Sequence, residues 1–120
     1  MGQRASKFDR RLIGVWMSDR RRTFRHFKPK MGCPPQSLRK LKAMFGKLVV
    51  RWGRGRCYTE LDGYCDSVAY EVIARDTSSV VIHYRDCVTE TDTIQHIHFD
   101  ENYYWIAVSG SLIEWFRRVE

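Results

Sequence analysis

The stretch Leu12-Ile13-Gly14-Val15-Trp16 opens a series of short, strand-like segments that runs to the end of the chain. From residue 47 onward, segments rich in β-branched and aromatic residues alternate with short polar turns, as antiparallel strands and their connections do. The sequence therefore predicts an all-β protein, an antiparallel up-and-down barrel of about eight strands. The expected strands are 12–18, 47–53, 56–61, 67–74, 79–86, 92–99, 102–108 and 112–119.

One helical segment, residues 37–46, is expected between the first and second strands. Leu38, Leu41 and Phe45 recur at helical spacing, and lysines and arginines fill the opposite face. A serine and a glycine suit the two ends of this helix. The preceding Cys33-Pro34-Pro35 is expected to be a loop, because proline interrupts regular structure.

The 120 residues fit one domain, which we place at residues 11–120 after a flexible basic arm at 1–10. No apolar run approaches the ~20 residues of a membrane span, and the first residues lack the apolar core of a signal peptide. The expected compartment is therefore the cytoplasm. Met1-Gly2-Gln3-Arg4-Ala5-Ser6 also fits the N-myristoylation pattern, and an acyl chain on Gly2 together with nearby basic residues would hold the protein on a membrane.

Four cysteines are present, and the local pattern argues against a disulfide between Cys57 and Cys65. Asp62-Gly63 predicts a two-residue hairpin, which sets Glu60 opposite Cys65 and Cys57 opposite Val68. The two cysteines are then out of register. No CxxC or zinc-type spacing occurs either, so we expect free thiols, in agreement with a reducing compartment.

Charge is divided unevenly along the chain, whose net charge is +7. Residues 1–56 hold 17 Lys/Arg and 2 Asp/Glu, a balance of +15, whereas residues 57–120 hold 4 and 12, a balance of −8. The basic block 20–56 could therefore bind a polyanion, such as a nucleic acid or an anionic membrane surface. The alternative is a solvated face or pairing with the acidic half. No nucleic-acid-binding motif appears.

Gly14 and Trp16, together with Arg117 or Arg118 near the end of the chain, resemble the calycins, the superfamily of lipocalins and fatty-acid-binding proteins. In that superfamily a Gly-x-Trp on the first strand closes one end of the barrel, and a basic residue of the last strand packs across the indole. The resemblance covers about residues 10–120 and implies that one of the two arginines lies over Trp16. The helix at 37–46 is similar to the lid of the fatty-acid-binding branch. The chain departs from the family in lacking a clear disulfide and a helix after the barrel, and in having eight strands where that branch has ten.

The barrel interior is the expected binding site. If side chains alternate regularly, its walls are Leu48, Val50, Trp52, Tyr70, Val72, Ile82, Tyr84, Ile97, Phe99, Tyr103 and Trp105. From these we select as ligand-binding residues Trp52, Tyr70, Val72, Ile82, Tyr84, Tyr103 and Trp105.

Apolar walls with a few polar ends are typical of ligand pockets, so the sequence favours noncatalytic binding of a small apolar or amphipathic molecule. Leu38, Leu41 and Phe45 of the helix would then face the mouth of the cavity. The basic residues of the helix would attract an anionic head group. No cofactor is expected. The alternative is a core filled by side chains, with function residing in an interaction surface.

The histidines suggest a metal- or haem-binding alternative. His96 and His98 lie on one face of a strand, and His83 lies on the strand before. Convergence of the three imidazoles would resemble a zinc site with an open position, and a single imidazole could bind haem. Ile97 and Phe99 form the more apolar face, however, so His96 and His98 are expected to point outward and to bind no metal.

The sequence shows no sign of a catalytic centre. It contains no Ser/His/Asp order, phosphate-binding loop or paired carboxylates, so an enzyme is not expected. Asp19 and Glu114 are isolated acids near the barrel ends, where they could pair with arginines.

Overall fold

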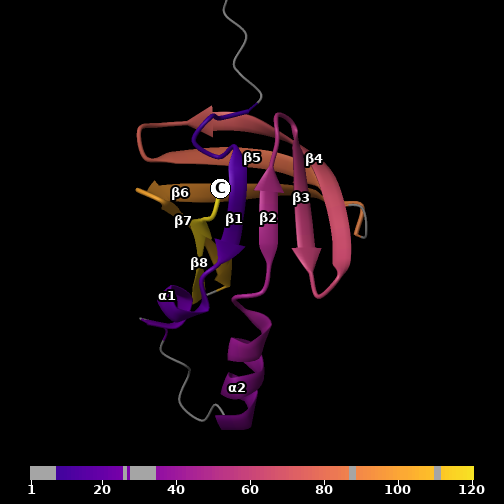
Figure 1. The fold of residues 1–120 in the computed structure, drawn as a ribbon. Helices are drawn as coiled ribbons and strands as arrows, with labels where there is room; N and C mark the ends of the chain where they lie inside the picture. Colours follow the sequence, from indigo (N-terminus) through magenta and orange to yellow (C-terminus); the bar gives the residue numbers. More distant parts are fainter. Residues whose placement is uncertain (1–7, 26, 28–34, 87–88, 110–111) are drawn as a thin grey trace, which may run out of the picture.

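A single closed barrel forms the body of the molecule (Figure 1). The computed structural model describes residues 8–25, 27, 35–86, 89–109 and 112–120. Within these residues, eight strands each pair antiparallel with the next, and the last pairs with the first. The strands are β1 Gly14–Ser18, β2 Val49–Trp52, β3 Arg56–Leu61, β4 Tyr64–Arg75, β5 Ser79–Arg85, β6 Asp92–Asp100, β7 Tyr103–Ser109 and β8 Leu112–Arg118. The predicted fold class is therefore confirmed.

The hairpin between β3 and β4 follows the turn chemistry of Asp62-Gly63. Both residues have positive φ, 49° and 86°, as a two-residue hairpin turn requires. Strand β4 begins at Tyr64, earlier than the predicted residue 67, because pairing continues up to the turn.

The cysteine register follows from the same hairpin. Cys57 pairs with Val68 and Cys65 pairs with Glu60, as predicted. Both are free thiols, the first buried and the second exposed. Cys33 and Cys87 lie outside the described residues.

Two helices, α1 Arg20–Arg25 and α2 Pro35–Met44, connect β1 to β2. Helix α1 forms in the basic stretch, where the backbone N–H of Arg22 donates to the Asp19 carboxylate at 2.9 Å and caps the first turn. Helix α2 starts at Pro35, which was expected in a loop, because the first helical turn does not use the missing N–H. No helix in the described part of the chain is long and apolar enough to cross a bilayer.

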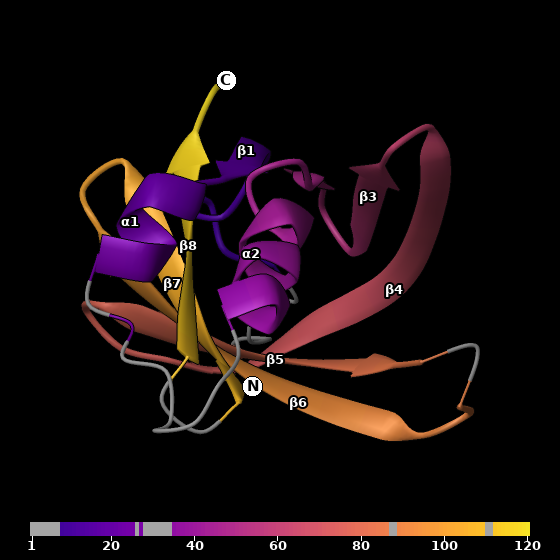
Figure 2. The same ribbon diagram turned by 90° about the horizontal axis from the view of Figure 1, so that it is seen from below.

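Both helices lie at the same end of the barrel (Figures 1 and 2). Helix α1 lies beside β8, where the hydroxyl of Thr23 accepts a hydrogen bond from the backbone N–H of Trp115 at 3.0 Å. Helix α2 leads directly into β2. The connection between β1 and β2 thus places two helices at one end of the barrel before the remaining strands follow.

Trp16 and Arg118 close the barrel between its first and last strands. They are paired in the β1–β8 register, and the Arg118 guanidinium lies 4.3 Å from the centre of the indole ring. Its two terminal nitrogens donate to the carbonyls of Ile13 at 2.9 Å and Arg11 at 2.6 Å. Trp16 is 1% exposed. Arg118 is therefore the arginine that the calycin resemblance implied, whereas Arg117 is exposed on the outer face.

Gly14 makes this closure possible. Its φ is +139°, a backbone conformation that side chains disfavour. A Cβ at this position would lie 2.5 Å from a guanidinium nitrogen of Arg118 and 2.6 Å from the carbonyl oxygen of Glu120. The glycine therefore leaves the space that the guanidinium occupies beside Trp16.

The segment before β1 packs on the barrel. Asp9 is buried and pairs with Arg11 at 2.9 Å and Arg75 at 3.4 Å. The hydrogen bond from Arg11 lowers the pKa of Asp9. Phe8 packs against the core. Residues 8 and 9, which the sequence analysis assigned to the basic arm, thus belong to the barrel; residues 1–7 lie outside the described part.

Replacing Arg118 with alanine should lower the free energy of unfolding by roughly 2–4 kcal/mol. The variant loses the cation–π contact and leaves two carbonyls without their charged donor. Arg117→Ala removes the same charge from the exposed neighbour and should cost less than ~1 kcal/mol. Urea denaturation of the two variants measures the difference, and equal losses would show that the arginine over Trp16 does not hold the barrel closed.

Candidate functional site

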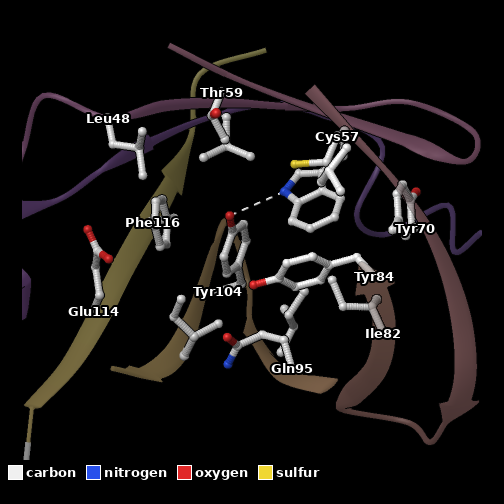
Figure 3. A pocket seen from close by; sticks show the side chains of 15 residues that line it. Leu48, Cys57, Thr59, Tyr70, Ile82, Tyr84, Gln95, Tyr104, Glu114 and Phe116 are labelled. Carbon is white, nitrogen blue, oxygen red and sulfur yellow. Dashed lines mark hydrogen bonds between the residues drawn. The ribbon is translucent and has the colours of Figure 1, made fainter. Parts of the chain in front are cut away.

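A cavity of about 260 Å³ lies inside the barrel (Figure 3). Ligand pockets commonly span ~300–1,000 Å³, but an apolar cavity of ~150 Å³ already binds benzene. The space therefore suits a small molecule and not a long lipid. It is lined by Leu48, Val50, Trp52, Cys57, Thr59, Val68, Tyr70, Ile82, Tyr84, Gln95, Ile97, Tyr104, Ile106, Glu114 and Phe116. The interior is thus not completely filled by side chains.

Four of the seven predicted ligand-binding residues line this cavity. They are Trp52, Tyr70, Ile82 and Tyr84, which come from β2, β4 and β5. Val72 is buried in the core but does not line the cavity. The even-numbered residues of β2 and β5 face inward because side chains alternate along each strand, and on β4 this holds up to Val72, after which a β-bulge shifts the register.

Tyr103 and Trp105 were predicted to face the interior, and this placement is wrong. Tyr104, which is 2% exposed, and Ile106 line the cavity from β7 instead. Three consecutive aromatic residues make both faces of this strand apolar, so alternation alone could not decide which face is buried.

Outside the barrel, Trp105 stacks on His98 with ring centres 3.8 Å apart. Tyr103 and Trp115 both contact the guanidinium of Arg22, at 4.1 and 4.3 Å. The outward aromatic residues of β7 and β8 therefore contact α1 and other side chains of the outer surface, and they do not line the cavity.

Most polar groups around the cavity are neutral. The indole N–H of Trp52 donates to the hydroxyl of Tyr104 at 3.2 Å, the dashed line in Figure 3. Burial raises the pKa of Tyr104. Burial also raises the pKa of the Cys57 thiol to about 12, so this thiol stays protonated at neutral pH. These groups can form hydrogen bonds but carry no charge.

Glu114 is a site residue that the sequence analysis missed. The sequence suggested that it pairs with arginines near a barrel end, but its side chain lines the cavity and is 9% exposed. The Ser18 hydroxyl donates to its Oε2 at 2.7 Å and accepts from the backbone N–H of Gly46 at 3.1 Å. Burial raises the pKa of Glu114, and the hydrogen bond from Ser18 opposes this effect.

A signal for the position of Glu114 existed in the sequence. Leu112, Glu114 and Phe116 share one face of β8, and all three are buried. The charge of Glu114 favoured the surface, whereas its place in the alternation indicates the interior. The other isolated acid, Asp19, caps α1.

The three candidate histidines do not converge on a metal site. In the β5–β6 register, His83 lies opposite Ile94, and His96 lies opposite Val81. The His83 ring nitrogens lie 3.5 Å from a Glu71 oxygen and 3.1 Å from an Asp92 oxygen.

His96 and His98 face outward, as predicted. Ile97 between them is 1% exposed, and His96 contacts the Ser79 hydroxyl at 2.8 Å. The described residues contain no group of three His, Cys, Asp or Glu side chains that could hold a metal ion. The three imidazoles therefore do not converge in the way that the metal-binding alternative required.

The predicted lid is only partly described. Phe45 packs against Phe24 of α1, with ring centres 5.3 Å apart, and does not line the cavity. This corrects its expected place at the cavity mouth. The side chains of Leu38 and Leu41 lie outside the described residues. Leu48, in the connection from α2 to β2, lines the cavity instead.

Comparison of the chain with protein-family models, with curated proteins and with solved structures gives no match. The closed barrel is established by its strand pairing. Membership of the calycins stays a prediction, which rests on the Gly14-x-Trp16 element and on Arg118 across the indole.

Relative to wild type, Glu114→Gln should have a more favourable effect on the free energy of unfolding at neutral pH than at acidic pH. The pKa of Glu114 is raised in the folded state, so its contribution to stability is fully present below its ordinary pKa. That contribution is lost as the pH rises through the raised value. Urea denaturation across this pH range measures the free energy of unfolding. Glu60→Gln, at an exposed position on β3, is the matched control. If the difference in free energy of unfolding between Glu114→Gln and wild type does not change with pH, the raised pKa of Glu114 is contradicted.

Proposed function

We propose that this protein binds a small apolar or amphipathic molecule, without catalysis, inside the barrel. The observation that carries the proposal is the cavity of about 260 Å³ inside the barrel. Aliphatic and aromatic side chains dominate the lining. Transfer of an apolar ligand from water into such a space is favourable by about 25 cal/mol per Å² of surface buried.

The lining supports binding and not reaction. No histidine or lysine is among the described residues that line the cavity, and the one thiol, Cys57, is kept protonated by burial. A protonated thiol is a poor nucleophile. The tyrosine, threonine and glutamine side chains around the cavity can orient a ligand through hydrogen bonds.

Indole or benzene should bind to the full chain in the micromolar range, as measured by calorimetry or ligand-observed NMR. Ile106→Trp places a larger side chain in the cavity and should abolish this binding. Ile94→Trp makes the same change on the outer face of β6, where the residue is 65% exposed, and should leave binding intact.

Circular dichroism of both variants confirms that each has folded. Binding of the probe to Ile106→Trp with wild-type affinity would place the ligand outside the cavity. A wild-type protein that binds neither probe would contradict the proposal.

A second candidate function, binding of a polyanion, is favoured by a separate observation. An open hollow between α1 and α2 is lined by Arg20, Arg21, Phe24, Arg25, Arg39, Lys42 and Ala43. None of these five cations forms an ion pair with a described acid. Ion pairs that join the basic half to the acidic half include Arg22–Asp100 at 3.4 Å and Lys47–Asp62 at 4.0 Å. Internal pairing therefore leaves the hollow positive.

Arg21→Gln combined with Lys42→Gln should weaken binding of a single-stranded oligonucleotide. It should also lower the slope of log affinity against log salt by roughly 1–1.5, because each lost phosphate contact contributes ~0.7. Arg51→Gln combined with Arg56→Gln removes the same charge from exposed strand positions and should change the slope less. Fluorescence anisotropy across a salt series measures both. Equal effects of the two double variants would show a diffuse charge effect and no binding hollow.

A further inference from the structure

We propose that the ligand of the barrel cavity carries an amine at its polar end, and that Glu114 is the residue that binds this amine. The inference rests on the proposed function, ligand binding in the cavity, and names the chemical class of the ligand. It also departs from the sequence-based expectation of an anionic head group.

The charges of the lining residues favour a cation. Glu114 is the only carboxyl side chain among the described residues that line the cavity, and no lysine, arginine or histidine is among them. A carboxylate ligand would place a second acid beside Glu114 with no cation to balance it. An ammonium group would instead neutralise the buried carboxylate through a charge-assisted hydrogen bond.

Within the described part of the chain, one oxygen of Glu114 accepts a hydrogen bond and the other has no hydrogen-bond partner. The hydroxyl of Ser18 donates a hydrogen bond to Oε2 at 2.7 Å. Ser18 is itself fixed by the backbone N–H of Gly46. Because Glu114 is already oriented and buried without ligand, binding of an amine at Oε1 would not require the additional cost of ordering and desolvating this carboxylate.

The position of Glu114 suits an amphipathic ligand. Figure 3 shows the carboxylate on the side of the cavity where Leu48 and Phe116 lie, while Tyr84 and Ile82 lie across the cavity from it. Ser18, which forms a hydrogen bond with Glu114, lies at the end of β1 that leads into the helices. An apolar group could therefore fill the interior while the amine stays near the helical end.

Other charges near Glu114 lie outside the cavity. On β8 itself, Arg117 is exposed and Arg118 is held over Trp16. On α1, which packs against β8, Arg22 stacks on the outer aromatic residues, and the cap residue Asp19 bonds to the helix backbone. Strands β1 and β7 bring no charged side chain.

The remaining cations of α1, Arg20, Arg21 and Arg25, line the open hollow against α2. Salt screens such exposed charges over ~8 Å, whereas a contact within the cavity is screened much less. The direct pairing with Glu114 should therefore outweigh the long-range attraction of the helices for anions.

Hexylamine, hexanol and hexanoate test the proposal, because they share one apolar chain and differ in the polar end. Each is titrated by calorimetry into the full chain at neutral pH, where the amine is protonated. Hexylamine should bind roughly tenfold or more tightly than hexanol, and hexanoate should bind most weakly. Glu114→Gln should remove the advantage of the amine and leave hexanol affinity within about twofold.

Glu60→Gln, which removes one exposed carboxylate, is the matched control and should keep the preference for the amine. If hexanol binds as tightly as hexylamine to the wild type, the inference is overturned and the proposed function stands. If Glu114→Gln and Glu60→Gln weaken hexylamine equally, the assignment to Glu114 is overturned. If none of the three compounds binds, the proposed function is overturned together with the inference. The wild-type ranking tests the proposal even if Glu114→Gln fails to fold.

Discussion

The contact between the Arg118 guanidinium and the Trp16 indole is the constraint on which the rest of the structure depends. It lies where the last strand meets the first, so it joins residues from opposite ends of the chain. The same guanidinium binds the carbonyls of Arg11 and Ile13, which fixes the segment that leads into β1. A barrel closed in this way has no unpaired edge strand, and its inner faces form one continuous wall.

This wall separates two surfaces of opposite electrostatic character. Inside, the described residues that line the cavity include one carboxyl, Glu114, whose pKa is raised by burial, and their other polar groups are neutral. Outside, five cationic side chains line the hollow between α1 and α2, at the helical end of the barrel. Water screens a charge in the buried interior less than it screens the exposed cations of the hollow, so an electrostatic contact made inside is stronger than one made outside. We therefore propose different partners for the two surfaces, a small cationic or neutral molecule inside and a polyanion outside.

Local patterns were sufficient to predict most of the barrel. The Asp62-Gly63 turn predicted the register of β3 and β4, including the pairing of Cys57 with Val68, because a two-residue turn leaves only one register. On β2 and β5, alternation placed Trp52 and Ile82 correctly on the inner face. Local patterns were insufficient on β7, where Tyr103, Tyr104 and Trp105 offered aromatic residues to both faces. At Glu114 the alternation did indicate the interior, but the charge of the residue favoured the surface and led to the wrong placement.

The sequence by itself determined the number and order of the strands and the hairpin register at Asp62-Gly63. These features depend on turn chemistry and strand periodicity, both of which are local. The pairing of a tryptophan near one end with an arginine near the other was implied only by the resemblance to the calycins. Only the tertiary structure decided that Arg118 and not Arg117 covers Trp16, that Tyr104 faces inward, and that the interior retains a cavity with Glu114 at its edge. The physical reason is that a cavity is the volume left over when side chains from all eight strands have packed, and the environment of a buried carboxyl is set by residues far apart in the chain.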